Sequence, residues 1–194
     1  MSTLKKTVMI SLLLMTFLSS ACGGRGTSSF YINQDIDFSF IKKVAVLPLE
    51  NLTNERFAGD AVRQVVISEL LASRLVEVVC PGDVSAAYEN LKIKTGQYPS
   101  AEQIKTLGNT LKVQAVIMGS LNKFGEIRDG NVSAPEVSLT LMMADTSSGS
   151  IIWSASKTYG GADFLAKHFG ARADTMSETA LKVVRDAIHT LYKY

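Results

Sequence analysis

The stretch from Lys43 to Leu49 reads Lys-Val-Ala-Val-Leu-Pro-Leu, an almost uninterrupted apolar run. Such runs are typical of strands that are buried on both faces of a sheet. Pro48 has no N–H to donate to a strand ladder, so it limits the length of this strand. The stretch therefore predicts a short, fully buried strand that ends near Pro48.

An amphipathic helix is predicted directly after this strand, from about Ala58 to Arg74, followed by a second buried strand from Leu75 to Cys80. A strand, helix and strand in succession favour two parallel strands with a right-handed crossover. Cys80 is interpreted as a small buried hydrophobe. The helix would bury one apolar stripe, formed by Val62, Val65, Val66, Ile67, Leu70 and Leu71.

The middle of the chain predicts two more helices, over 84–92 and 101–111. Ser100 and Gln103 have the spacing of a capping box at the start of the second helix. Strand residues follow from Ala115 to Phe124, where Gly119 allows a bulge or a close backbone approach.

Two further strands complete an antiparallel meander. The first is predicted by the alternation of Val137, Leu139, Leu141 and Met143 with polar or less buried positions. The second runs from Ile151 to Tyr159, with Ile151, Trp153 and Ala155 expected on its inner face. A loop with one helical turn over 162–168 and a final helix from Asp174 or Thr175 are expected to follow.

These elements predict an α/β fold. Its mixed sheet has about five strands, begins with the parallel unit and ends with the antiparallel meander, and packs with about four helices. An aromatic-rich lead-in from Phe30 to Ile41 is expected to pack on this domain or to add an edge strand.

The N-terminus has the three parts of a signal peptide: Lys5 and Lys6, an apolar run over 8–18, and small residues before Cys22. Eleven helical residues rise only about 16 Å, which is too short to cross a bilayer. The segment resembles a lipobox, although Leu18 stands one place earlier than usual. We therefore expect a signal peptide over 1–21, a lipid-anchored tether and lead-in over 22–40, and one domain over 41–194. An ordinary secretory signal with an incidental cysteine is the alternative.

Lipid attached to Cys22 is the only prosthetic group expected, since the rest of the chain lacks the residue patterns of other sites. Without Lys5 and Lys6 the chain has 18 basic and 18 acidic residues, so its charge does not indicate a nucleic-acid partner. Cys80 has no second cysteine for an intramolecular disulfide. His168 and His189 are far apart in sequence, and no Gly-x-Ser-x-Gly elbow occurs, so neither a metal site nor a catalytic serine is predicted.

The loop after the first strand is the best candidate for recognition, because ligand surfaces collect at the carboxyl ends of parallel strands. Asn51, Asn54, Arg56 and Phe57 are its candidate partner-binding residues. Arg and aromatic side chains anchor interfaces more often than other types. In the alternative interpretation Phe57 packs against the start of the helix, and the Asn and Thr residues form turns and a helix cap.

Three motifs in this chain are similar to a known group of envelope proteins: Val44 to Thr53, Gln114 to Ser120, and Asp145 to Gly149 followed by Ile152-Trp153-Ser154. They resemble the domain shared by the curli secretion lipoprotein, the lipoprotein activators of penicillin-binding proteins and the amino-terminal domain of TolB. The resemblance implies a periplasmic α/β domain that contacts other proteins. The connection from Phe124 to Pro135 is too short for the membrane-spanning hairpins of the curli channel, at about 9–11 residues per crossing.

Three functions remain open at this point. We favour a non-enzymatic module, anchored to the periplasmic face of the outer membrane by lipid and binding other envelope proteins; Gly23 after the cysteine fits outer-membrane sorting. A subunit of a ring-forming, curli-like secretion complex is the second hypothesis, and it implies a homo-oligomer. The third is an envelope hydrolase that uses acidic residues of the loop, with Glu50 and Asp60 as its test positions.

Overall fold

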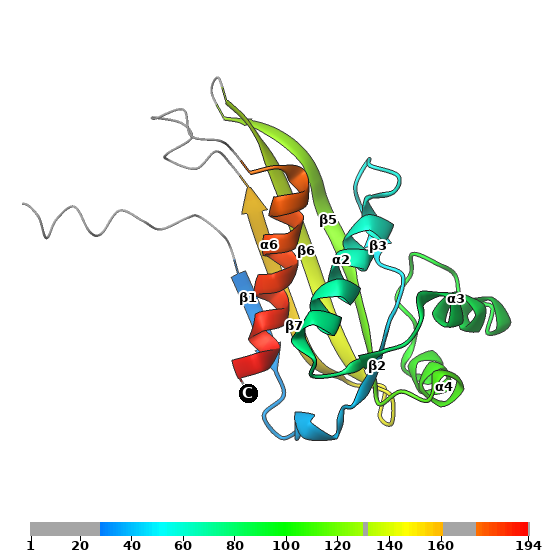
Figure 1. The fold of residues 1–194 in the computed structure, drawn as a ribbon. Helices are drawn as coiled ribbons and strands as arrows, with labels where there is room; N and C mark the ends of the chain where they lie inside the picture. Colours follow the sequence, from blue (N-terminus) through cyan, green and yellow to red (C-terminus); the bar gives the residue numbers. More distant parts are fainter. Residues whose placement is uncertain (1–27, 130–131, 161–173, 194) are drawn as a thin grey trace, which may run out of the picture.

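The computed structural model describes residues 28–129, 132–160 and 174–193, which form a seven-stranded mixed sheet and its covering helices (Figure 1). The strands are β1 (Ser28–Ile32), β2 (Lys43–Val46), β3 (Glu50–Asn51), β4 (Glu77–Val78), β5 (Ala115–Asp129), β6 (Val132–Asp145) and β7 (Ile151–Gly160). Their order in the sheet is β1-β7-β6-β5-β2-β4, and β3 pairs with β5 outside this path. The predicted α/β class is confirmed, with short strands added to the expected five.

Four α-helices cover the sheet within the described residues: α2 (Ala58–Ser73), α3 (Pro81–Asn90), α4 (Ala101–Leu111) and α6 (Met176–Ile188). Short 3-10 helices, η2 (Phe38–Phe40) and η3 (His189–Lys193), follow β1 and α6. Figure 1 shows α2 and α6 side by side in front of the sheet, with α3 and α4 grouped at the end of the sheet that carries β2.

Strand β2 is buried on both faces, as its sequence predicts. Val44 and Val46 belong to the larger core, which the sheet forms with α2 and α6. Ala45 and Leu47 belong to a second core with buried residues of α3 and α4. Because successive side chains of a strand point to opposite faces, the apolar run supplies both cores at once.

The predicted parallel unit is present, but its second strand is short and lies at an edge. Strands β2 and β4 pair in parallel, with Lys43 opposite Glu77 and Val44 opposite Val78. The prediction of a buried strand from Leu75 to Cys80 is wrong, because β4 has two residues and Glu77 is exposed. Pro81 starts a helix directly after it, which ends the pairing.

Cys80 is exposed rather than buried, so that prediction is also wrong. It is the N-cap residue of α3, and Pro81 occupies the first helical turn. Proline is favoured there because its fixed φ suits a helix and its missing N–H has no partner inside the helix. The helix therefore begins three residues earlier than the predicted Val84.

The antiparallel meander of β5, β6 and β7 agrees with the sequence except at one residue. Val137, Leu139, Leu141 and Met143 are all buried, as their alternation predicts. The pairing of β6 with β7, however, shifts register between Met143 and Ala144 of β6. Ile152 of β7 is therefore buried, whereas Ile151 is 38% exposed. Trp153 and Ala155 are buried as expected.

The predicted starts of α4 and α6 are confirmed, whereas the predicted buried stripe of α2 is wrong at one residue. Helix α4 spans the expected residues, with the Ser100 capping box formed on both sides. Helix α6 begins after Thr175, which forms a second capping box with Glu178. On α2, Leu71 is 54% exposed and does not widen the buried stripe.

The lead-in contributes an edge strand. Strand β1 pairs antiparallel with β7, from Ser28 opposite Lys157 to Ile32 opposite Trp153. Ser28 and Ser29 are therefore sheet residues and not part of a free tether. The predicted signal peptide, Cys22, the tether up to Thr27 and the expected turn over 162–168 lie outside the described residues.

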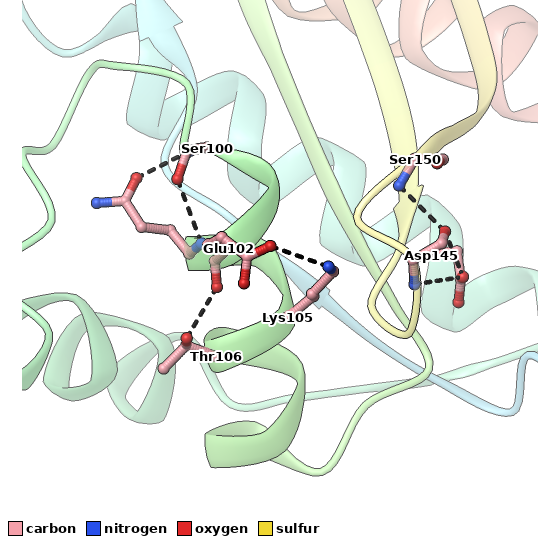
Figure 2. A network of polar contacts seen from close by, with 8 residues as sticks. Ser100, Glu102, Lys105, Thr106, Asp145 and Ser150 are labelled. Atoms are coloured by element: carbon pink, nitrogen blue, oxygen red, sulfur yellow. Dashed lines mark hydrogen bonds and ion pairs between the residues drawn. The ribbon is translucent and has the colours of Figure 1, made fainter.

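The Asp145 to Gly149 motif forms a tight turn that packs against α4. Figure 2 shows Ser100 and Glu102, at the start of this helix, beside the turn that carries Asp145 and Ser150. A Cβ added to Gly149 would lie 2.8 Å from Ala101 Cβ, and one added to Gly108 would lie 2.3 Å from Thr146 Cβ. Glycines in the turn and in α4 thus allow these two segments to pack closely against each other.

Candidate partner-binding surface

The loop between β3 and α2 is held in shape by Asn51. Its side-chain oxygen accepts hydrogen bonds from the Thr53 N–H (3.1 Å) and the Thr53 hydroxyl (2.7 Å), and its amide nitrogen donates to the Glu55 carbonyl (2.8 Å). A Cβ on Gly59 would lie 3.1 Å from Asn51 Cβ, so the start of α2 packs closely against the same residue. Asn51 therefore fixes the loop, as the turn-forming interpretation expects.

Phe57 is 70% exposed and is the N-cap residue of α2, without a side-chain capping hydrogen bond. Its ring lies under the Arg56 guanidinium, with 5.4 Å from Arg56 Cζ to the ring centroid. Leu52 in the same loop is 59% exposed. We call Leu52, Arg56 and Phe57 the loop surface. The exposure of Phe57 argues against the alternative in which it packs on the helix start. Asn51 and Thr53 form turns but no side-chain helix cap, and Asn54 is exposed in the same loop.

Tyr98, from the connection between α3 and α4, lies near Glu50 of β3, the strand that leads into this loop. Burial raises the pKa of its hydroxyl, a hydrogen bond with Ser120 opposes that shift, and the charge of Glu50 adds to it. The Tyr98 side chain is still 42% exposed. The sequence analysis missed Tyr98, because only the pairing of β3 with β5 brings Glu50 next to Ser120.

The acidic residues of the loop have different neighbours. The charge of Glu50 acts on Tyr98, whereas the charge of Asp60 acts on Arg63 in the first turns of α2. In the part of the chain that the structure describes, no group of three or more His, Cys, Asp or Glu residues could hold a metal ion. The interactions of these acids thus belong to two separate groups of side chains.

Arg63 is a buried charged residue that the sequence analysis did not single out. It is 6% exposed and donates from Nε (3.1 Å) and Nη2 (2.7 Å) to the Val46 carbonyl oxygen. Burial lowers the pKa of its guanidinium, and Asp60 and Tyr88 oppose the shift. Burial also raises the pKa of the neighbouring Tyr88 to about 12, so Tyr88 stays neutral. Arg63 thus connects α2 to the end of β2.

No helix among residues 28–129, 132–160 and 174–193 is long and apolar enough to cross a membrane. No protein-family model matches the chain, and no curated protein sequence matches it.

Solved structures show what the fold resembles. The PelC dodecamer from Paraburkholderia phytofirmans matches with a TM-score of 0.61 at 18% identity, over 86% of this chain and 96% of that chain. Lipoprotein GNA1162 from Neisseria meningitidis matches with a TM-score of 0.57 at 12% identity, over 79% of this chain and 99% of that chain. At these identities the likeness shows the fold alone: this chain has an α/β fold that is also found in a bacterial lipoprotein.

The predicted resemblance to the activators of penicillin-binding proteins has a weaker counterpart. The LpoB C-terminal domain from Salmonella enterica matches with a TM-score of 0.46 at 19% identity, over 61% of this chain and 82% of that chain. This likeness is too low to carry an argument. The resemblance to the curli secretion lipoprotein and to TolB stays a prediction from the sequence.

Proposed function

We propose that this protein is a non-enzymatic, lipid-anchored module of the bacterial envelope that binds another envelope protein through the loop surface. The observation that carries the proposal is an exposed Phe57 with Arg56 stacked on it, in a loop that Asn51 holds in place. A preformed aromatic and Arg pair loses little conformational freedom on binding and is typical of interface anchors. The signal-peptide pattern before Cys22 supports the envelope location.

Further features support this reading. The likeness of fold to lipoprotein GNA1162 is compatible with an anchored domain. Gly23 after Cys22 favours the periplasmic face of the outer membrane as the destination. The acidic residues Glu50 and Asp60 interact with separate groups, which gives the hydrolase hypothesis no support from geometry.

Photocrosslinking in intact cells tests the proposed surface. A photoreactive phenylalanine analogue at Phe57 should yield a discrete crosslinked product with one envelope protein. The matched control places the same analogue at Leu71, which is also exposed and lies at the other end of α2. Identical products from both positions, or none from Phe57, would contradict the proposal.

A second candidate is a homo-oligomeric ring, in which the loop surface binds another copy of this chain. It is favoured by the likeness of fold to PelC, a protein described as a dodecamer. Mass measurement by light scattering in mild detergent separates the two candidates. A monomer at micromolar concentration would argue against a ring, whereas a single large oligomer that Phe57→Ser dissociates would support it.

A further inference from the structure

The distance between Cys22 and the sheet is short. Ser28, the first residue of β1, is only six positions after Cys22. A fully extended chain spans at most about 3.6 Å per residue, so six residues reach about 20 Å. An acyl group on Cys22 would therefore hold the start of β1 within about 20 Å of the bilayer surface.

Exposed aromatic side chains gather at this same edge of the sheet. Phe30 is 50% exposed, Tyr31 is 52% exposed, and Tyr159 near the end of β7 is 38% exposed. Phe30 is opposite the buried Ala155 and Tyr31 is opposite Ser154, so the two rings point to opposite faces of β1. Tyr159 comes two residues after Lys157, the partner of Ser28, at the end where the chain enters the sheet. Aromatic rings thus flank the β1 edge on both faces.

Charged residues lie near both ends of β1. The strand itself, Ser28 to Ile32, contains no charged residue and no proline. Lys157 lies opposite Ser28 at the end near Cys22, whereas Asp35 and Asp37 follow the other end of the strand. Anionic phospholipid surfaces attract lysine and repel carboxylates. At the end near Cys22, however, the Tyr159 hydroxyl donates to Asp186 of α6 (2.7 Å), and Glu136 lies opposite Gly160. Both ends of β1 therefore have carboxylates nearby, and charge does not select one end for docking.

We propose that the β1 edge docks onto the phospholipid headgroup region, with Phe30 and Tyr31 as its contacts. This proposal rests on the proposed lipid anchor at Cys22. Tyrosine suits the headgroup region because its ring is apolar and its hydroxyl is polar, and aromatic residues are enriched at that depth. Together with the covalent lipid, these contacts fix how the domain is oriented on the membrane.

Docking at β1 leaves the loop surface available to a protein. Strand β3 lies four strand spacings from β1 across the sheet, about 19 Å at 4.8 Å per spacing. Figure 1 shows β1 at one side of the molecule and the β3–α2 connection beyond β5, toward the side of α3 and α4. The membrane and the protein partner would thus occupy different parts of the domain.

A nitroxide spin label can measure the depth of the β1 edge. The lipidated protein carries the label at Ser29→Cys, in a Cys80→Ser background because Cys80 is an exposed free thiol. It is placed in vesicles of phosphatidylethanolamine and phosphatidylglycerol. The label's accessibility to oxygen, relative to a water-soluble nickel chelate, should be severalfold higher than that of a control label at Glu77→Cys, an exposed residue of the opposite edge strand β4. The double substitution Phe30→Ser and Tyr31→Ser should remove this difference while the protein stays in the vesicle fraction.

Two outcomes would overturn the docking proposal. Equal accessibility ratios at Ser29→Cys and Glu77→Cys would mean that the domain is tethered but not docked. Dipolar broadening between Ser29→Cys labels on different molecules would mean that β1 pairs with a second copy. A protein that is absent from the membrane fraction would instead contradict the lipid anchor of the proposed function, so the two failures are distinguishable.

Discussion

At the scale of single residues, the Arg63 side chain completes a hydrogen-bond ladder between β2 and the β4 segment that the backbone alone cannot complete. The Glu77 N–H donates to the Lys42 carbonyl and the Val79 N–H donates to the Val44 carbonyl, so every second residue from Lys42 into β2 accepts from the β4 segment. The next acceptor is the Val46 carbonyl, and residue 81 would be its donor. Residue 81 is proline and has no N–H. The Arg63 guanidinium takes its place, which explains a charged side chain in a buried position.

Substituting Arg63→Met should therefore destabilise the protein. Met replaces the aliphatic part of the Arg63 side chain but has no N–H groups. The buried Val46 carbonyl therefore loses its donor, which costs about 1–3 kcal/mol. Arg56→Met is the control, because Arg56 is exposed and such substitutions usually change stability by less than about 0.5 kcal/mol. Urea unfolding followed by circular dichroism measures both. Equal stability of the two variants would show that the Arg63 hydrogen bonds do not matter for folding.

At the scale of elements, the pairing of β5 with β6 depends on a glycine. A Cβ on Gly119 would lie 2.1 Å from the Thr140 carbonyl oxygen, which belongs to the neighbouring backbone and cannot move aside easily. Gly119→Ala should destabilise the protein by about 1–3 kcal/mol, the usual cost of overpacking. Gly125→Ala provides the control in the same strand, because no atom lies within 4 Å of the Cβ position there. Thermal unfolding should show a clearly lower midpoint for Gly119→Ala alone.

The turn between β6 and β7 should make stability depend on pH. Burial would raise the pKa of Asp145, but hydrogen bonds from the backbone and hydroxyl groups of Ser147 and Ser148 outweigh this and lower the pKa below its ordinary value of 3.8. A carboxylate with a lowered folded-state pKa contributes its stability above the unfolded pKa and loses it as the pH falls through the folded pKa.

Asp145→Asn tests this pH dependence. The wild-type protein should be more stable than the variant by roughly 2 kcal/mol near neutral pH, because hydrogen bonds to charged groups are the stronger ones. The difference should shrink as the pH falls below about 3.8 and disappear below the lowered pKa of Asp145. Urea unfolding over this pH range measures it, and a difference that does not change with pH would contradict the account.

Element types and most element ends were predictable, because local patterns determine them. The capping box at Ser100 and the alternation along β6 depend on residues that are close in sequence. One error was local, because Pro81 starts a helix directly after Cys80 and shortens the predicted second strand. Others arose where remote segments meet. The burial of Ile152 depends on a register shift against β6, and the role of Arg63 depends on Pro81 at the start of α3.

At the candidate partner-binding surface, too, local features were predictable and contacts between remote segments were not. The exposed Phe57 and the turn-forming Asn51 belong to one loop, so the sequence could indicate both. Tyr98 joins them only through the pairing of β3 with β5, and no local pattern marks it. Local sequence therefore identified the loop but not its neighbour from the α3–α4 connection.

At the scale of the whole molecule, the two cysteines should have opposite importance. Cys22 would carry the lipid, whereas Cys80 caps α3 without a side-chain hydrogen bond and is exposed. Cys22→Ala should move the protein from the membrane fraction to the soluble periplasmic fraction, because aromatic contacts at one sheet edge bind a bilayer far more weakly than two or three acyl chains do. Cys80→Ala should leave the protein in the membrane fraction, and cell fractionation with immunoblotting compares the two. Retention of Cys22→Ala in membranes after a high-salt wash would mean that the domain is held by protein partners and not by lipid. Such retention would contradict the anchor and would leave the loop surface, with Phe57 at its centre, as the means by which the domain stays at its site.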